Sequence, residues 1–262
     1  MTHESAPVFG QDSAEASWLT TRLTGRWGHV TGVVPAGFEA YARVLHPVEQ
    51  EDQPSTSWAA VAEAAGTQIH ALAQWHLLAP RRGSTRPWWR TSGPDIGNLD
   101  PEALADLVTV LRRHTTTAAE CWFCLWSGYG WIHGSPSAVL LQFDESAGLS
   151  ESEPVPPAFP DDVLAADQLV RLAAREYLLG RGPLEAATRV GDQITPDWFE
   201  PQSPNIFWPT DRSWCVATEI DFDSTLVGGS EQLVTELVTH ERLEAFRIQP
   251  QDSLQDNADH VN

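Results

Sequence analysis

The strongest constraint on the fold of this chain is an alternating stretch that runs from Trp214 to Asp223. Successive side chains of a β-strand point to opposite faces, so a two-residue period predicts a strand with one face against a core. One face carries Trp214, Val216, Thr218, Ile220 and Phe222, and the other carries Cys215, Ala217, Glu219, Asp221 and Asp223. We therefore predict one continuous strand that ends with three carboxylates on a single face.

The residues on either side of this strand predict what it connects. An aromatic run at 206–208 precedes it, and the turn sequence Pro209-Thr210-Asp211-Arg212 between the two indicates a β-hairpin. After the strand, Gly228 and Gly229 predict a glycine loop, and Ser230 is a favourable N-cap for the apolar-periodic helix that follows. The predicted order is hairpin, acidic strand end, glycine loop and helix.

The three carboxylates form the main candidate site. Neighbours on one face of a strand lie about 7 Å apart, so the charges of Glu219, Asp221 and Asp223 repel unless solvent, a cation or hydrogen-bond donors offset them. We expect Asp223 to form an Asx-turn ahead of Ser224, because aspartate often bonds the backbone in such turns. We expect Glu219 and Asp221 to face a pocket.

Further elements predict the fold class. Asp100-Pro101 is a strong helix start and predicts a helix over about 101–114. We also predict helices from Pro54-Ser57 onward, from Thr67, from Asp161 to about 174 and near 184–190. Strand-like segments occur at 27–34, 38–48, 120–126, 138–143, 176–179 and 243–248. Because strands come both as hairpins and between helices, we predict an α+β fold with a mixed, largely antiparallel sheet and helices packed on it.

The domain organisation follows from the polar segments. Residues 1–16 and 250–262 lack apolar periodicity, so we predict a disordered N-terminus, a disordered tail and a single domain over 17–249. An acidic, proline-rich stretch at about 144–162 predicts a surface loop within that domain.

Cysteine usage and the N-terminus predict a cytoplasmic location. Three cysteines give no disulfide framework, and residues 1–16 lack the apolar run of a signal peptide. Cys121 and Cys124 fall on opposite faces of the strand at 120–126, which disfavours a disulfide between them. We predict that both are buried structural residues.

Charge excludes several functions. The net charge is −20 and the pI is about 4.6, which disfavours nucleic acid and acidic membrane surfaces as partners. All 16 basic residues are arginine, and the absence of lysine removes Schiff-base chemistry and a Walker-type phosphate loop.

Four blocks carry a resemblance: VPAGFEAYARVLHPV at 34–48, CWFCLWSGYG at 121–130, REYLLGRGPLEAA at 175–187, and the central segment at 203–230. Together they resemble a family of uncharacterised bacterial proteins of similar length. The resemblance implies a single domain over most of residues 27–248, and it carries over no activity, cofactor or catalytic residue.

Two functional hypotheses remain open. The first is a non-enzymatic module that binds a small molecule or a protein partner in a tryptophan-rich cleft, without a cofactor. The candidate binding residues are Glu219, Asp221, Asp223, Trp208, Trp214, Gly228, Gly229, Ser230 and His133.

The alternative is a hydrolase that depends on a divalent metal and acts on an anionic, phosphorylated substrate. Glu219, Asp221 and Asp223 would supply oxygen ligands to Mg²⁺ or Mn²⁺. The amides around the glycine loop and Ser230 would receive the anion, and His133 or His29 would act as the base.

Overall fold

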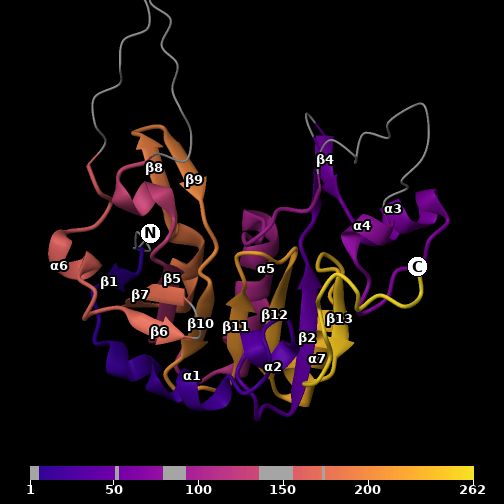
Figure 1. The fold of residues 1–262 in the computed structure, drawn as a ribbon, viewed down its shortest axis with the longest axis horizontal. Coiled ribbons are helices and arrows are strands. Elements are labelled where there is room, and N and C mark those ends of the chain that lie inside the picture. Colours follow the sequence, from indigo (N-terminus) through magenta and orange to yellow (C-terminus); the bar gives the residue numbers. More distant parts are fainter. Residues whose placement is uncertain (1–5, 51–52, 79–92, 136–155, 173–174) are drawn as a thin grey trace, which may run out of the picture.

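The fold is built on one antiparallel sheet. A computed structural model describes residues 6–50, 53–78, 93–135, 156–172 and 175–262 (Figure 1). Within these residues, nine strands form a sheet in the order β1-β7-β5-β10-β11-β12-β2-β13, with β6 paired to β7. Their bounds are β1 Val8–Phe9, β2 Ala40–Leu45, β5 Cys121–Trp126, β6 Val170–Leu172, β7 Arg175–Gly182, β10 Ile206–Pro209, β11 Cys215–Thr218, β12 Ser224–Gly229 and β13 Ala245–Ile248.

Helices and two small hairpins complete the structure. The α-helices are α1 Ser17–Arg22, α2 Val30–Val33, α3 Trp58–Ala65, α4 Trp75–Leu78, α5 Pro101–Leu111, α6 Asp161–Leu164 and α7 Glu231–Val238. Single 3-10 turns cover Ser13–Ala16, Arg112–His114, Gly130–His133 and Leu184–Arg189. The hairpins pair β3 Val48–Gln50 with β4 Gln53–Thr56, and β8 Gly191–Thr195 with β9 Trp198–Pro201. The predicted α+β class with a largely antiparallel sheet is confirmed.

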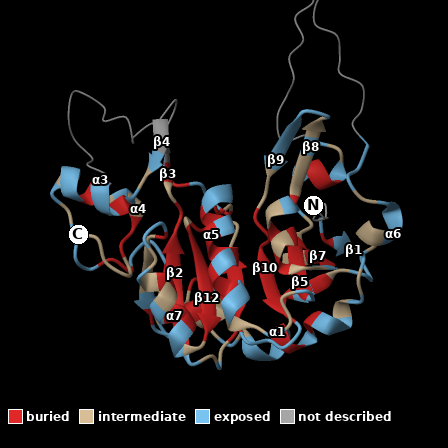
Figure 2. Cartoon of the chain, turned by 180° about the vertical axis from the view of Figure 1, so that it is seen from behind, coloured by how far each residue is buried: buried red, intermediate tan, exposed pale blue. Residues whose placement is uncertain are grey.

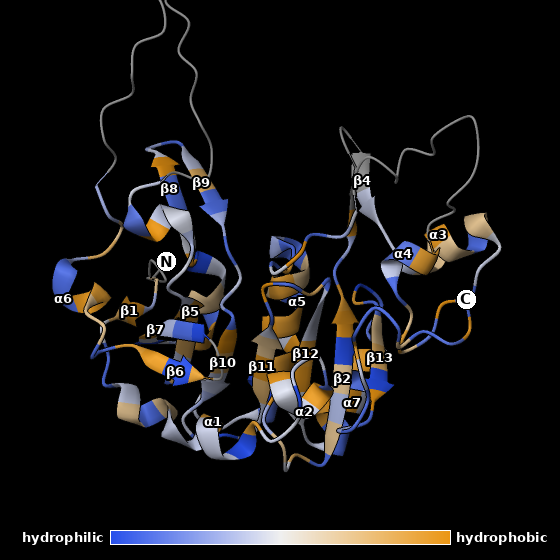
Figure 3. Ribbon diagram, in the orientation of Figure 1, coloured by the Kyte–Doolittle hydropathy of each residue, from blue (hydrophilic) through white to orange (hydrophobic). Residues whose placement is uncertain are grey.

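Each face of the sheet carries its own core. On one face α5 and α7 pack over Val44, Phe123, Phe207 and Val216, and Figure 2 shows these helices over strands that are buried along their length. On the other face Trp18 of α1, residues of α2 and Leu254 cover side chains of the same strands. Figure 3 shows the apolar residues gathered in the central strands that both layers share.

Local capping explains why several helices begin where the sequence predicts. Asp100 accepts hydrogen bonds from the N–H groups of Glu102 and Ala103 at the start of α5. Ser230 accepts from the N–H of Leu233 at the start of α7. The predicted helix at 101–114 is α5 followed by one 3-10 turn, and it is confirmed.

Other element predictions are wrong. Residues 27–34 contain the short helix α2 instead of a strand, and Thr67 does not begin a helix. The helix from Asp161 ends at Leu164 instead of near 174, because β6 starts at Val170 and pairs with β7. The predicted strand at 138–143 and the acidic loop as far as residue 155 lie outside the described residues, and so do residues 1–5.

The predicted glycine loop is also wrong, because Gly228 and Gly229 are buried within β12. A Cβ atom on Gly228 would lie 2.5 Å from the ring of Phe38, and one on Gly229 would lie 2.5 Å from Cδ2 of Leu233. These glycines are therefore explained by close packing on both sides of the strand.

The prediction of disorder at the chain ends is wrong for the residues described. Residues 6–16 include β1, which pairs with β7, and a 3-10 turn. Residues 250–262, here called the strap, pack against the body of the protein, with Leu254 and Ala258 buried.

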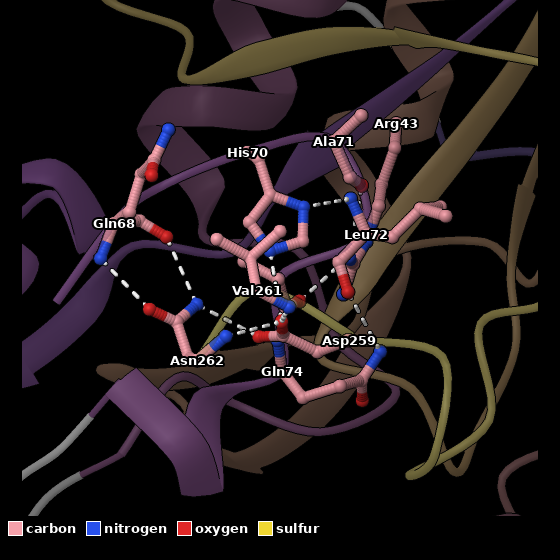
Figure 4. Close-up of polar contacts among 10 residues, drawn as sticks. Arg43, Gln68, His70, Ala71, Leu72, Gln74, Asp259, Val261 and Asn262 are labelled. Carbon is pink, nitrogen blue, oxygen red and sulfur yellow. Dashed lines mark hydrogen bonds and ion pairs between the residues drawn. The ribbon is translucent and has the colours of Figure 1, made fainter.

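Two sets of contacts hold the strap. At its start, the N–H of Val30 donates to the Asp252 carbonyl, and the N–H of Leu254 donates to the Gly28 carbonyl. At its end, the buried carboxylate of Asp259 lies 2.9 Å from Nε2 of His70 and 3.2 Å from the backbone nitrogen of Gln74 (Figure 4). The strap thus connects the segment before α2 to the segment after α3.

The placement of the cysteines agrees with the sequence prediction. Cys121 belongs to the core under α5, and Cys124 belongs to the core on the opposite face of the sheet. Both are buried and free of disulfides, and burial raises the pKa of the Cys121 thiol to about 12. Neither thiol is therefore poised to react.

We expect Cys124→Ser to lower the free energy of unfolding by about 1–3 kcal/mol, because a hydroxyl would be buried without a partner. Cys124→Ala should cost less, since it buries no polar group. Urea denaturation of the two variants measures the difference. Rapid labelling of a native thiol by a maleimide would contradict the structural role of these residues.

Candidate functional site

The acidic end of the central segment forms a turn, which corrects the predicted continuous strand. β11 ends at Thr218, and the N–H of Phe222 donates to the Glu219 carbonyl at 3.0 Å. A carboxylate oxygen of Glu219 also accepts the N–H of Asp221 at 2.6 Å. These bonds reverse the chain between β11 and β12, so Glu219, Asp221 and Asp223 do not share one strand face.

The three carboxylates have two different partners. Nε of Arg175 lies 2.6 Å from Glu219, and one terminal nitrogen of Arg175 lies 2.6 Å from Asp221. The guanidinium also lies over the ring of Trp126, with 5.7 Å from its carbon to the ring centroid. Burial opposes the charge of Arg175, but the two carboxylates raise its pKa above the usual value. Arg175 on β7 thus fixes both acidic residues of the turn.

Asp223 turns toward the other side and pairs with Arg43 of β2 at 3.1 Å. Arg43 is 1% exposed, and its remaining donors bind Ser224 and the carbonyl oxygens of Ala71 and Ala73. The predicted structural role of Asp223 therefore arises from an ion pair with a buried arginine, and an Asx-turn plays no part in it.

A cavity of about 350 Å³ lies against Glu219 and Asp221. Its lining residues come from the segment after α1, from α2 and from the ends of β6, β7, β10 and β11. Figure 1 shows α1 and α2 at the lower edge of the sheet. Its apolar walls come from Leu23, Trp27, Val33, Leu172, Ile206 and Ala217. Its polar residues are Arg175, Tyr177, Asn205, Thr218, Glu219 and Asp221. An apolar concave site with few polar groups is typical of small-molecule binding.

A chain of hydrogen bonds holds the hydroxyl of Thr218 on the α5–α7 face of the sheet, where Thr218 pairs with Thr225 and Thr225 pairs with Val44. Nδ1 of His46 lies 2.6 Å from the Asp95 carbonyl oxygen, which can only accept, so Nδ1 carries the ring proton. Nε2 then accepts from Thr225 at 3.0 Å, and Thr225 accepts from Thr218 at 2.8 Å. Burial lowers the pKa of His46 to about 4, so the ring stays neutral near pH 7. The hydroxyl of Thr218 is therefore engaged on the face opposite Ala217, whose side chain lines the cavity.

Several predicted site residues lie elsewhere. Trp208 packs on Trp18 in one core, while Trp214 lies in the other core and donates to the Leu111 carbonyl, so the two do not share a cleft. His133 lies in a 3-10 turn, where Nε2 donates to the Ser127 carbonyl at 2.7 Å. His29 pairs with Ser253 of the strap through its backbone.

The anion site predicted at the start of α7 does not form. Gly228 and Gly229 are strand residues, the side chain of Ser230 caps the helix, and the N–H of Glu231 donates to the carboxylate of Glu39. This helix end is therefore already occupied by the protein's own acceptors.

The geometry does not gather metal ligands around the turn. Asp223 pairs with Arg43, whereas Glu219 and Asp221 pair with Arg175, so no single ion can reach all three carboxylates without breaking these pairs. Within the residues that the structure describes, no group of three or more His, Cys, Asp or Glu side chains is placed to hold a metal.

Other cavities lie among the described residues. One of about 370 Å³ lies between the start of α3 and Glu244, where the carboxylate already accepts the first N–H groups of that helix. Another of about 470 Å³ lies between Phe9, Trp131 and Phe159. Of these cavities, the one at Glu219 is lined by two of the predicted site residues, Glu219 and Asp221.

The sequence analysis does not identify five of the residues that line the cavity, which are Trp27, Arg175, Tyr177, Asn205 and Thr218. Arg175 and Tyr177 lie on β7, more than 40 positions from the acidic turn, and only the sheet order brings them to it. Trp27 belongs to a segment predicted as a strand. The alternation at 175–177 is the one available signal, since it places both residues on the same strand face.

Comparison with known proteins finds no matching family model, no matching curated protein and no matching solved structure. None of the described helices has the length and apolar character needed to cross a lipid bilayer.

Proposed function

We propose that the protein is a non-enzymatic binding module that holds a small, largely apolar molecule in the cavity beside Glu219. The observation that carries the proposal is the cavity itself, of about 350 Å³, with Leu, Ile, Val and Trp side chains on its walls and Arg175, Glu219 and Asp221 at one end. Binding sites of this kind use apolar contact for affinity and a few polar groups for orientation.

The chemistry available at the cavity supports binding over hydrolysis. His46 and the hydroxyls of Thr225 and Thr218 lie on the other face of the sheet, and both ring nitrogens of His46 are engaged. The carboxylates of Glu219 and Asp221 are held by Arg175, so the metal-dependent alternative would have to break the ion pairs that shape the turn.

The partner and the location belong to the same proposal. The net charge of −20 favours a small-molecule partner over nucleic acid or an acidic membrane. Free, buried cysteines fit a reducing cytoplasm. Membership of the bacterial family that the four sequence blocks resemble stays a prediction.

The test is binding of N-phenyl-1-naphthylamine, a neutral apolar fluorophore, to the wild-type protein and to Ala217→Phe. Ala217 lies on β11 and lines the cavity, so the added ring should occupy the ligand volume. We expect saturable binding to the wild type and at least a tenfold weaker affinity in the variant, because the apolar contacts are lost.

Ala105→Phe is the matched control. It adds the same ring on the exposed face of α5, and it should bind the fluorophore like the wild type. Circular dichroism checks that all three proteins are folded. Absence of saturable binding to the wild type, or equal binding to Ala217→Phe, would refute the proposed function.

A further inference from the structure

Most polar side chains at this cavity are already bonded within the protein. Asn205 offers none, because its carbonyl oxygen accepts the N–H of Trp126 at 2.7 Å and its NH₂ group donates to Tyr129 and to the Thr218 carbonyl. The hydroxyl of Thr218 is bonded to Thr225 on the opposite face of the sheet. A ligand in this cavity therefore meets the hydroxyl of Tyr177 and the charged end formed by Arg175, Glu219 and Asp221.

Tyr177 gives an independent indication that a polar ligand atom is expected here. Its side chain lines the cavity and is 7% exposed, and its hydroxyl is not among the buried atoms left without a partner. A ligand that displaces water from this hydroxyl must replace the lost hydrogen bond. Burial also raises the pKa of Tyr177, so the group stays neutral.

The charged end of the cavity has one carboxylate in excess of its cation. Two carboxylates, Glu219 and Asp221, face the single guanidinium of Arg175. Both oxygens of Glu219 accept hydrogen bonds, one from Arg175 and one from the N–H of Asp221. Asp221 accepts only one bond, and its side chain is 57% exposed at the mouth of the cavity. The net charge of this end is therefore −1, which favours a cation over an anion.

The aromatic side chains that line the cavity also favour a cationic ligand. Trp27 and Tyr177 both line the cavity, and Trp27 remains 56% exposed although it contacts the ring of Phe222 at a centroid distance of 6.1 Å. The face of an aromatic ring attracts a cation, most strongly in tryptophan. The net charge of −20 adds a long-range attraction for cations and a repulsion for anions.

We infer that the ligand of this cavity is an amphiphilic amine, with an apolar body between the walls and a protonated nitrogen directed to Asp221 and the hydroxyl of Tyr177. The inference rests on the proposed function, since it names the class of molecule that the same cavity binds. Arg175 acts as a positioning residue, because it holds Glu219 and Asp221 at the mouth of the cavity.

The test uses three probes of one shape: 4-phenylbutylamine, 4-phenylbutanol and 4-phenylbutyrate. Each is titrated against the wild-type protein loaded with N-phenyl-1-naphthylamine, and displacement of the fluorophore is followed. We expect the amine to displace it at a concentration at least tenfold below that of the carboxylate, with the alcohol between them. High salt should reduce the advantage of the amine, because charge attraction is screened.

In Asp221→Asn, the amine should displace the fluorophore only at the concentration that the alcohol needs. The concentration needed for the alcohol should not change. Asp197→Asn is the matched control, because it removes an equal charge from an exposed position between β8 and β9 and should keep the preference. If the alcohol binds as well as the amine, or if Asp221→Asn keeps the preference, the ligand class is wrong while the binding function stands. If none of the three displaces the bound fluorophore, the ligand class is overturned, while the binding function is judged by the fluorophore and Ala217→Phe alone.

Discussion

Asp223→Asn is expected to lower the free energy of unfolding by about 3 kcal/mol, the lower end of the range found when one partner of a buried ion pair is removed, because the side chain of Asp223 is 24% exposed. Arg43 is 1% exposed, and Asp223 is the carboxylate with which it pairs, at 3.1 Å. Asparagine can still accept a hydrogen bond, but it removes the carboxylate that pairs directly with the guanidinium and leaves only the more distant charge of Asp259. Arginine does not lose its proton at accessible pH, so the variant cannot relieve this cost by titration.

Asp221→Asn is the control for that prediction. It removes a carboxylate two positions away, from an ion pair at the mouth of the cavity where solvent screens the interaction. Exposed pairs contribute about 0–1 kcal/mol, so the change should be small. Urea denaturation measures both variants, and an equal effect of the two substitutions would show that Arg43 does not depend on Asp223.

Removal of the strap, residues 250–262, should destabilise the protein by about 4 kcal/mol or more. The deletion exposes the core that Leu254 covers, and a buried leucine contributes about 1.5–3 kcal/mol. It also leaves the N–H groups of Val30 and Gln74 without their acceptors, at about 1–3 kcal/mol for each that stays buried. A melting temperature of the shortened protein within two degrees of that of the full chain would contradict this prediction.

Asp259 makes part of this stability depend on pH. Burial favours its neutral form, but hydrogen bonds from the side chain of Asn262, from the N–H groups of Val261 and Asn262 and from His70 outweigh it. They hold the pKa of Asp259 well below the value of about 3.9 in an unfolded chain. The stabilisation is therefore complete above about pH 4 and is lost as the pH falls toward the folded pKa. Asp259→Asn should flatten this acid dependence of the melting temperature.

The strap also supports one wall of the cavity. Its start holds the segment from Gly28 to Thr31, and Trp27 and Val33 on either side of that segment line the cavity. Removing the strap should therefore weaken binding of the fluorophore as well as lower stability.

The elements that the sequence predicts correctly are those whose signals are local. Asp100 and Ser230 start helices because a side-chain oxygen accepts an N–H two or three residues ahead, and this requires no distant partner. The hairpin of β10 and β11 follows from a turn sequence, and the N–H of Arg212 does donate to the Pro209 carbonyl. The opposite faces of Cys121 and Cys124 follow from the strand period alone.

The errors arise where a distant residue decides the outcome. The alternation of apolar and polar residues continues past Thr218 in the sequence, but the strand ends there. Glu219 and Asp221 pair with Arg175, and Asp223 pairs with Arg43 on the other side of the turn. Gly228 and Gly229 are typical loop residues, yet Phe38 and Leu233 require them within a strand. The strap is polar and lacks periodicity, and its order depends on His70 and Gln74, nearly 190 positions earlier.

The candidate site could be predicted only in part for the same reason. The acidic turn was visible as three closely spaced carboxylates, and two of them do line the cavity. The sequence analysis predicts that Trp208 and Trp214 belong to the same site, whereas the tryptophan that lines the cavity is Trp27. No local pattern joins Trp27, Arg175 and Glu219, because they meet only once the sheet order and the α1–α2 layer are formed.

The most direct measurement of the central claim is a crystal structure of the protein with 4-phenylbutylamine. The account predicts electron density for the phenyl ring between Trp27 and Tyr177, with the nitrogen within hydrogen-bond distance of the Asp221 carboxylate. Density for the amine in the cavity between Phe9, Trp131 and Phe159, or the ligand in the Glu219 cavity with its nitrogen turned away from Asp221, would contradict it.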